Sequence, residues 1–127
     1  MKPSTPSSQA SVIEARLILF ASRIIDLVES LPNQLAPKHL GGQLLRSGTS
    51  PALNYGEARS AESKADFVHK MKVCLKELRE THVCLKIIAL RDWFKAGKLD
   101  FLLAECNELI AIFVASTKTA SDRKMDN

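Results

Sequence analysis

The sequence has few residues that interrupt helices and no long apolar run. Glycine and proline number only five each among 127 residues, and since they are the poorest helix formers, their scarcity favours long helices. No apolar segment approaches the roughly 20 residues that a membrane-spanning helix needs. Residues 1–11 are polar, with one lysine and no apolar stretch of the signal-peptide kind. We therefore expect a cytoplasmic protein with no membrane partner.

Cysteine is also scarce. The three cysteines, Cys74, Cys84 and Cys106, are an odd number without the spacing of a disulfide framework. A reducing compartment keeps such thiols free, and free cysteine is among the most buried residue types. We expect three reduced, mostly buried thiols.

Composition and length indicate one folded domain. The chain is 46% hydrophobic and 25% charged, which excludes bulk disorder, and its length allows a core without disulfides or metal. Residues 38–98 hold twelve basic and six acidic residues, a net charge of +6, whereas the rest of the chain carries −2. This basic middle is compatible with a polyanionic partner, although charge alone favours a solvated helix surface.

Apolar residues recur at steps of three and four in four segments, which is the period of an amphipathic helix. The predicted helices span residues 11–31, 38–59, 63–93 and 100–120. Residues 1–10 and 121–127 are predicted to be a disordered tail and a frayed end. No segment alternates with period two, so no sheet is expected. Short connections favour an all-α, antiparallel up-down-up-down four-helix bundle.

Several positions carry local predictions. Pro51 removes a donor from the second helix, so we expect a kink there. Ser63, three residues before Asp66, predicts a capped start to the third helix, and Asp100 is a candidate N-cap of the fourth. Ile18, Ile25 and Leu45 are expected to widen the buried stripes. Phe101 and Ile112 lie off their stripe and are candidates for a contact between subunits.

No constellation of catalytic or metal-binding type is evident. A di-iron bundle needs an acidic-x-x-His unit on each of two helices, and only Asp66 and His69 supply one, so His69 is better read as a surface residue. Cys74 and Cys84 stand ten residues apart, unlike zinc ligands. No phosphate-binding glycine loop appears, and nothing orients a Cys–His pair. We expect no enzyme activity, no catalytic residue, no metal and no cofactor.

A polar stripe in the second helix has two interpretations. Ser47, Ser50, Asn54 and Glu57 share one helix face beside the apolar stripe. Buried polar groups must be paired, so the stripe is either an internal hydrogen-bonded network or a contact for a ligand or nucleic acid. The ion pairs expected of a network join Glu57 to Lys76 or Arg79, and Arg46 or Arg59 to Glu77 or Glu80.

The basic residues supply a candidate nucleic-acid surface, since phosphate contacts need only positive charge. The candidate residues are Lys64, Lys70, Lys72, Lys76, Arg79, Lys86, Arg46 and Arg59, with Lys38 as an addition. Four of them, Lys72, Lys76, Arg79 and Lys86, can share the outer face of the third helix. Aromatic residues for base stacking are few, so this surface favours nonspecific binding of the RNA or DNA backbone.

Residues 39–85 resemble a known family. The specific runs are Leu-Leu-Arg-Ser at 44–47, Ala-Glu-Ser-Lys-Ala-Asp-Phe at 61–67 and Leu-Lys-Glu-Leu-Arg-Glu-Thr at 75–81. The chain is similar here to the four-helix bundle proteins encoded in intervening sequences of bacterial 23S rRNA genes. That family looks related to the accessory variability protein of diversity-generating retroelements.

The resemblance implies a bundle that assembles into a ring-shaped homopentamer and has no enzyme activity. The retroelement relative binds nucleic acid and a reverse transcriptase through basic surface. The family's polar signature, which is expected to be mainly structural, falls on Arg46, Ser47, Ser50, Asn54, Glu57, Glu77 and Glu80. Pro51, Tyr55 and Gly56 depart from the family pattern, and the tryptophan common near Cys84 is missing, which puts individual surface contacts in doubt.

Two functions are therefore weighed. The first is a non-catalytic, oligomeric protein that binds the nucleic-acid backbone through basic surface. The alternative is a protein–protein scaffold or accessory subunit that does not bind nucleic acid.

Overall fold

The computed structural model describes residues 8–123, with the side chain of Arg123 left out, and contains four helices. They are α1 (Gln9–Glu29), α2 (Leu35–Ala58), α3 (Lys64–Ala89) and α4 (Asp100–Arg123). No strand occurs within the described residues. Of the two predicted tails, residues 1–7 and 124–127 lie outside the described part. The remainder is mostly helical, since α1 begins at Gln9 and α4 continues to Arg123.

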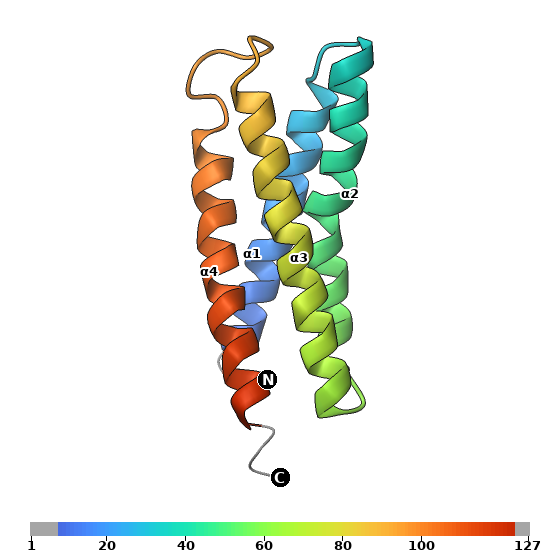
Figure 1. Ribbon diagram of the computed structural model, residues 1–127, viewed down its shortest axis with the longest axis vertical. Helices are drawn as coiled ribbons and strands as arrows, with labels where there is room; N and C mark the ends of the chain where they lie inside the picture. Colours follow the sequence, from blue (N-terminus) through green and yellow to red (C-terminus); the bar gives the residue numbers. More distant parts are fainter. Residues whose placement is uncertain (1–7, 124–127) are drawn as a thin grey trace, which may run out of the picture.

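The four helices run alternately up and down the long axis, so both ends of the described chain lie at the same end of the bundle (Figure 1). Each helix packs mainly on its neighbours in sequence. The α2–α3 interface is the most extensive, and the α1–α4 interface, which closes the bundle, is the smallest of the four. The predicted antiparallel four-helix bundle is confirmed.

One buried stripe from each helix forms the core. Phe20 and Ile24 of α1, Leu44 of α2 and Leu78 of α3 are fully buried. On α4, Phe113 is also buried, and Tyr55 meets it edge-to-face with ring centroids 5.5 Å apart. The hydrophobic effect acting on these side chains holds the four amphipathic helices together. Among residues 8–123, no helix combines the length and apolar character needed to cross a bilayer.

The helix ends follow local capping chemistry. The Ser63 hydroxyl accepts a hydrogen bond from the Asp66 backbone N–H at 3.0 Å, which confirms the predicted cap of α3. The prediction that Asp100 caps α4 is wrong, because Asp100 is the first helical residue and follows the buried Leu99. The α3 helix ends at Ala89 rather than at residue 93, and Gly97 turns the following loop with φ +87°.

Some expected burial is wrong. Ile18, Ile25 and Leu45 are exposed, with exposed fractions of 56%, 39% and 40%. For Ile18 and Ile25 the reason is geometric: α1 makes little contact with α4, so the core-facing stripe of α1 is narrower than its apolar content suggests. Ile112, in contrast, is partly buried against the core. Phe101 is exposed as expected, and the Arg23 guanidinium lies 4.5 Å from the centre of its ring.

Helix α2 continues through the buried Pro51 from Leu35 to Ala58. The Thr49 hydroxyl donates to the Leu45 carbonyl at 2.7 Å, one turn earlier in the helix. The Cys74 thiol of α3 donates to the Pro51 carbonyl at 3.5 Å. Side chains from α2 and α3 therefore bond backbone carbonyls on either side of this turn.

Gly48 lies where α2 closely approaches α1. A Cβ atom at this position would lie 2.9 Å from Cγ2 of Ile24, a fully buried β-branched side chain. Gly42, one and a half turns earlier in α2, is exposed, and a Cβ there would meet nothing within 4 Å. The packing of α2 against α1 therefore leaves no room for a larger residue at position 48, whereas position 42 has room for a side chain.

We predict opposite effects for the two alanine substitutions. Gly48→Ala should lower the free energy of unfolding by about 1–3 kcal/mol through overpacking against Ile24. Gly42→Ala should raise it by about 0.5–1 kcal/mol, because alanine is the better helix former in open space. Urea unfolding followed by circular dichroism measures both. Equal shifts of the same sign would contradict this account of the α1–α2 contact.

Candidate nucleic-acid interface

The candidate basic residues divide into two sets in the structure. Arg46, Arg59 and Lys70 are each bound to carboxylates of neighbouring helices. Lys64, at the first position of α3, is exposed and also has an interaction of its own. The second set, which we call the α3 cationic face, has no ion-pair partner among residues 8–122. It consists of Lys72, Lys76, Arg79 and Lys86.

Arg46 bridges two acids of α3. Its Nη1 donates to Glu77 Oε1 at 2.8 Å and its Nη2 donates to Glu80 Oε1 at 2.6 Å. The hydrogen bonds that Arg46 donates to these carboxylates, the one to Glu80 first, raise the pKa of Arg46 above its ordinary value. Glu77 is buried, so the guanidinium compensates a carboxylate that has lost most of its water. The expected pairing of Arg46 with Glu77 and Glu80 is confirmed.

The other expected ion pairs are wrong. Glu57 accepts from Lys70 at 2.9 Å rather than from Lys76 or Arg79. Arg59 donates to Glu14 of α1 at 2.6 Å and not to α3. The hydrogen bond from Lys70 to Glu57 is the main reason that the pKa of Lys70 is raised.

The antiparallel register of α2 and α3 accounts for these partners. Over the length of the interface, residues nearer the start of α2 bond residues nearer the end of α3. The bonded pairs are Glu57–Lys70, Pro51–Cys74, Arg46–Glu77, Ser47–Thr81 and Leu40–Cys84. Lys76 and Arg79 lie too far along α3 to reach Glu57. The sequence analysis did not predict which residues of α2 and α3 lie opposite each other, although the short connection between the two helices indicates this alignment.

The polar stripe of α2 is mostly satisfied within the bundle. Thr81 donates to Ser47 Oγ at 2.9 Å, and both side chains are buried. The Asn54 amide donates to Ser50 Oγ at 2.9 Å on the same helix. These bonds favour the network interpretation of the stripe over the ligand-contact interpretation. Thr81 is the member of the network that the sequence analysis missed.

The α3 cationic face is formed by spacing alone. Its four residues follow steps of 4, 3 and 7, which return to the same side of a helix, and all four are exposed. The two acids nearest to them, Glu77 and Glu80, are already bound by Arg46. Arg46 offsets one of these two carboxylate charges, so the four cations taken together with Arg46, Glu77 and Glu80 keep a net charge of +3 (+5 − 2).

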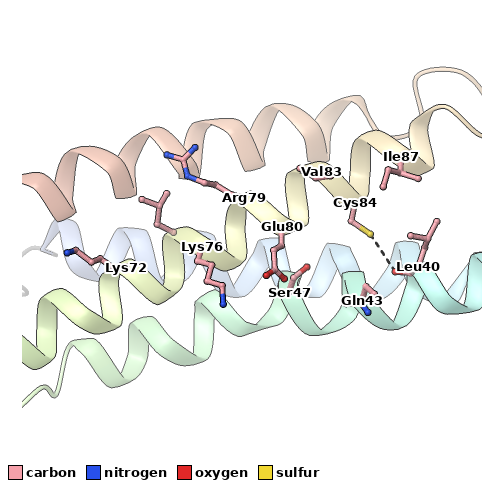
Figure 2. A pocket seen from close by; sticks show the side chains of 11 residues that line it. Leu40, Gln43, Ser47, Lys72, Lys76, Arg79, Glu80, Val83, Cys84 and Ile87 are labelled. Atoms are coloured by element: carbon pink, nitrogen blue, oxygen red, sulfur yellow. Dashed lines mark hydrogen bonds between the residues drawn. The ribbon is translucent and has the colours of Figure 1, made fainter.

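An apolar groove runs between α2 and α3 beside this face, with a volume of about 710 Å³. Leu40 of α2 and Leu75, Val83 and Ile87 of α3 supply its apolar lining. Three members of the cationic face, Lys72, Lys76 and Arg79, also line it. Figure 2 shows Lys76 and Glu80 extending from α3 toward α2, and the Cys84 thiol bonded to the Leu40 carbonyl.

The titratable side chains near this surface do not form a catalytic set. Burial raises the pKa values of Cys74 and Cys106 to about 12 and also raises that of Cys84, so the thiols stay protonated at neutral pH. All three are free and buried, as predicted. Burial, with repulsion from Lys86, lowers the pKa of His82, which therefore adds little charge. His69 is exposed, and residues 8–122 contain no cluster of three potential metal ligands.

These features define a class of protein: an antiparallel helical bundle with one unneutralised basic face beside an apolar groove. Residues 12–115 match the model of the 23S rRNA-intervening sequence protein family, and the chain belongs to that family. The family named from the sequence resemblance is thus confirmed. Comparison with curated proteins finds no match.

One solved structure is closely similar. It is described as a protein with unknown function from the S23 ribosomal protein family of Bacteroides thetaiotaomicron VPI-5482. The two chains are 28% identical and superpose with a TM-score of 0.79, covering 87% of this chain and 99% of the other. The likeness extends over the whole bundle, so the fold described above is shared by both proteins.

We predict that Arg46→Met lowers the free energy of unfolding, because it leaves the buried Glu77 carboxylate without its cation. The double variant Arg46→Met/Glu77→Met should recover stability relative to the single variant, since both charges are then replaced by apolar side chains. Thermal unfolding is measured for the unaltered protein, Arg46→Met, Glu77→Met and the double variant. A double variant that is less stable than Arg46→Met alone would disprove the compensating role of Arg46.

Proposed function

We propose that this chain is a non-catalytic, homo-oligomeric protein that binds the phosphate backbone of RNA or DNA through the α3 cationic face. The observation that carries the proposal is the division of the basic residues. Arg46, Arg59 and Lys70 are engaged in ion pairs within the bundle. The cationic face keeps four charges without ion-pair partners among residues 8–122, aligned on one exposed side of a single helix.

The geometry suits a backbone contact. From Lys72 to Lys86 the helix rises about 21 Å, a length over which a nucleic-acid strand presents several phosphates. Flexible lysine and arginine side chains adapt to phosphate positions without reading bases. No aromatic side chain lines this groove, which favours contacts to the backbone over base stacking.

Membership in a family named for 23S rRNA intervening sequences agrees with a nucleic-acid partner without identifying it. The resemblance to the retroelement accessory protein, which binds nucleic acid through basic surface, also supports the proposal. We place the protein in the cytoplasm, and we expect neither cofactor nor metal for this function.

Self-association is supported by the outer side of α1. Val12, Ile18, Leu19 and Ile25 are exposed there, with exposed fractions of 39–56%, while the opposite side of the same helix lies in the core. A helix that is apolar on both sides is usually buried on both sides, and a second copy of the chain would cover the outer one. The resemblance to the family specifies a ring of five copies.

The nucleic-acid proposal predicts a steep dependence of affinity on salt. With four phosphate contacts per chain, the slope of log Kobs against log salt for duplex DNA should be about −3.6 per chain engaged. Lys72→Gln/Lys76→Gln/Arg79→Gln should reduce this slope to about −0.9, because one contact remains. Fluorescence anisotropy with labelled duplexes of DNA and RNA, titrated at several salt concentrations, measures both values.

The control for this experiment removes the same charge elsewhere. Lys95→Gln/Lys98→Gln/Lys118→Gln replaces three exposed cations of the α3–α4 loop and of α4, and it should leave the slope near that of the unaltered protein. If both triple variants bind alike, or if the unaltered protein binds no duplex at low salt, the proposal fails.

Assembly through α1 predicts that Ile18→Glu shifts the protein toward the single-chain mass of 14.0 kDa, because a charge would be buried in the contact. Leu53→Glu, at an exposed leucine of α2, should leave the mass unchanged. Sedimentation velocity distinguishes these outcomes. An unaltered protein that already sediments as a single chain would exclude the oligomer.

A further inference from the structure

The groove between α2 and α3 has a chemistry that phosphate binding does not use. Most of its accessible surface is apolar, and two of its four aliphatic lining residues, Val83 and Ile87, remain 52% and 42% exposed. A nucleic-acid backbone that contacts the lysines would gain nothing from these side chains. Apolar surface removed from water contributes roughly 25 cal/mol per Å², so an occupant with its own apolar face would be stabilised here.

The two walls of the groove differ in charge. The α3 wall carries Lys72, Lys76 and Arg79, which have no ion-pair partner within residues 8–122. The α2 wall presents Gln43 and Ser47, which are uncharged. Glu80, the single acid of the lining, is held by Arg46 at 2.6 Å. The groove therefore selects a partner that is apolar along its centre and negatively charged along one edge.

The length and shape of the groove specify the form of that partner. Its lining on α3 extends from Lys72 to Ile87, which corresponds to about 22 Å or four helical turns. Ser47 of α2 and Cys84 of α3, both short side chains, are among the lining residues, and the Cys84 thiol bonds the Leu40 carbonyl of α2 (Figure 2). An amphipathic helix lying along such a groove inserts side chains spaced three and four residues apart.

We propose that the α2–α3 groove is a docking site for an acidic amphipathic helix of a partner protein. Its apolar face would pack on Leu40, Leu75, Val83 and Ile87, and its acidic edge would pair with Lys72, Lys76 and Arg79. The inference does not depend on nucleic-acid binding. Because the three cations are shared, the helix and a nucleic acid compete for this side of the bundle.

The test uses a fluorescent, end-blocked peptide of about 15 residues, long enough for four turns. It carries leucine at steps of three and four, with glutamate along one edge of that stripe. One control peptide has the same composition in an order that breaks the stripe, and another replaces glutamate by lysine. The stripe peptide should bind the full-length protein at least tenfold more tightly than either control. The proposal is overturned if the acidic peptide with the rearranged sequence binds as tightly as the stripe peptide, or if the stripe peptide does not bind.

Protein variants separate this site from the proposed nucleic-acid function. Val83→Ser/Ile87→Ser removes apolar surface without changing charge, so it should weaken the peptide about tenfold and leave duplex binding unchanged. Leu53→Ser, at an exposed leucine outside the groove, is the matched control and should bind both ligands normally. Circular dichroism checks that the variants fold. Peptide binding that survives Val83→Ser/Ile87→Ser contradicts the assigned site.

Two further readouts distinguish the alternatives. Excess duplex should displace the peptide from the unaltered protein. If no duplex binds while the peptide does, the nucleic-acid function fails and the docking site stands. If Val83→Ser/Ile87→Ser instead reduces the sedimenting mass, the groove is filled by a second copy of this chain, and the proposal of a separate partner is overturned.

Discussion

The antiparallel register between α2 and α3 is the constraint on which the surface of this protein depends. It is maintained by buried apolar contact and by a ladder of polar contacts, from Glu57–Lys70 near the connecting loop to Leu40–Cys84 near the far end. Since a buried polar group without a partner costs free energy, a shifted register would take Thr81 away from Ser47 and Arg46 away from Glu77. The ladder therefore favours one alignment of the two helices.

The same register decides which cations are available. Arg46 and Lys70 face acids across the α2–α3 interface and are neutralised there. Lys72, Lys76, Arg79 and Lys86 stand on the outer side of α3, where the register brings them no acid for an ion pair within the described residues. A chain with a modest net charge of +4 thus acquires one concentrated basic face. The proposals of backbone binding and of an acidic helix both follow from this distribution.

The weak closure between α1 and α4 shapes the opposite side of the molecule. Arg16 of α1 donates to Glu105 of α4 at 2.7 Å and also pairs with Glu108, so ion pairs contribute where apolar contact is sparse. Ile18 and Leu19 remain uncovered. Apolar surface of this kind is common where two copies of a chain meet, which is the basis for assigning self-association to α1.

The sequence by itself determined the four helices, the bundle class, the family and the buried thiols. Helical periodicity and the scarcity of glycine and proline determine each helix from its own residues. Each amphipathic helix must then bury its apolar side, which favours a bundle. It also placed Lys72, Lys76, Arg79 and Lys86 on one side of a helix, because that is a matter of spacing. The sequence did not predict where α3 ends or that Ile18 and Leu45 are exposed. Both features depend on which other helices pack against these residues.

Only the tertiary structure decided which candidate residues are neutralised. The sequence predicted an acidic partner on α3 for Arg46, but it did not separate Arg59 and Lys70 from Lys72 or Arg79. These residues differ in whether an acid faces them from another helix. The groove likewise exists only because residues of α2 and of α3 are brought side by side. Periodicity reports the side of a helix on which a residue lies, whereas charge pairing and grooves depend on the distances between helices.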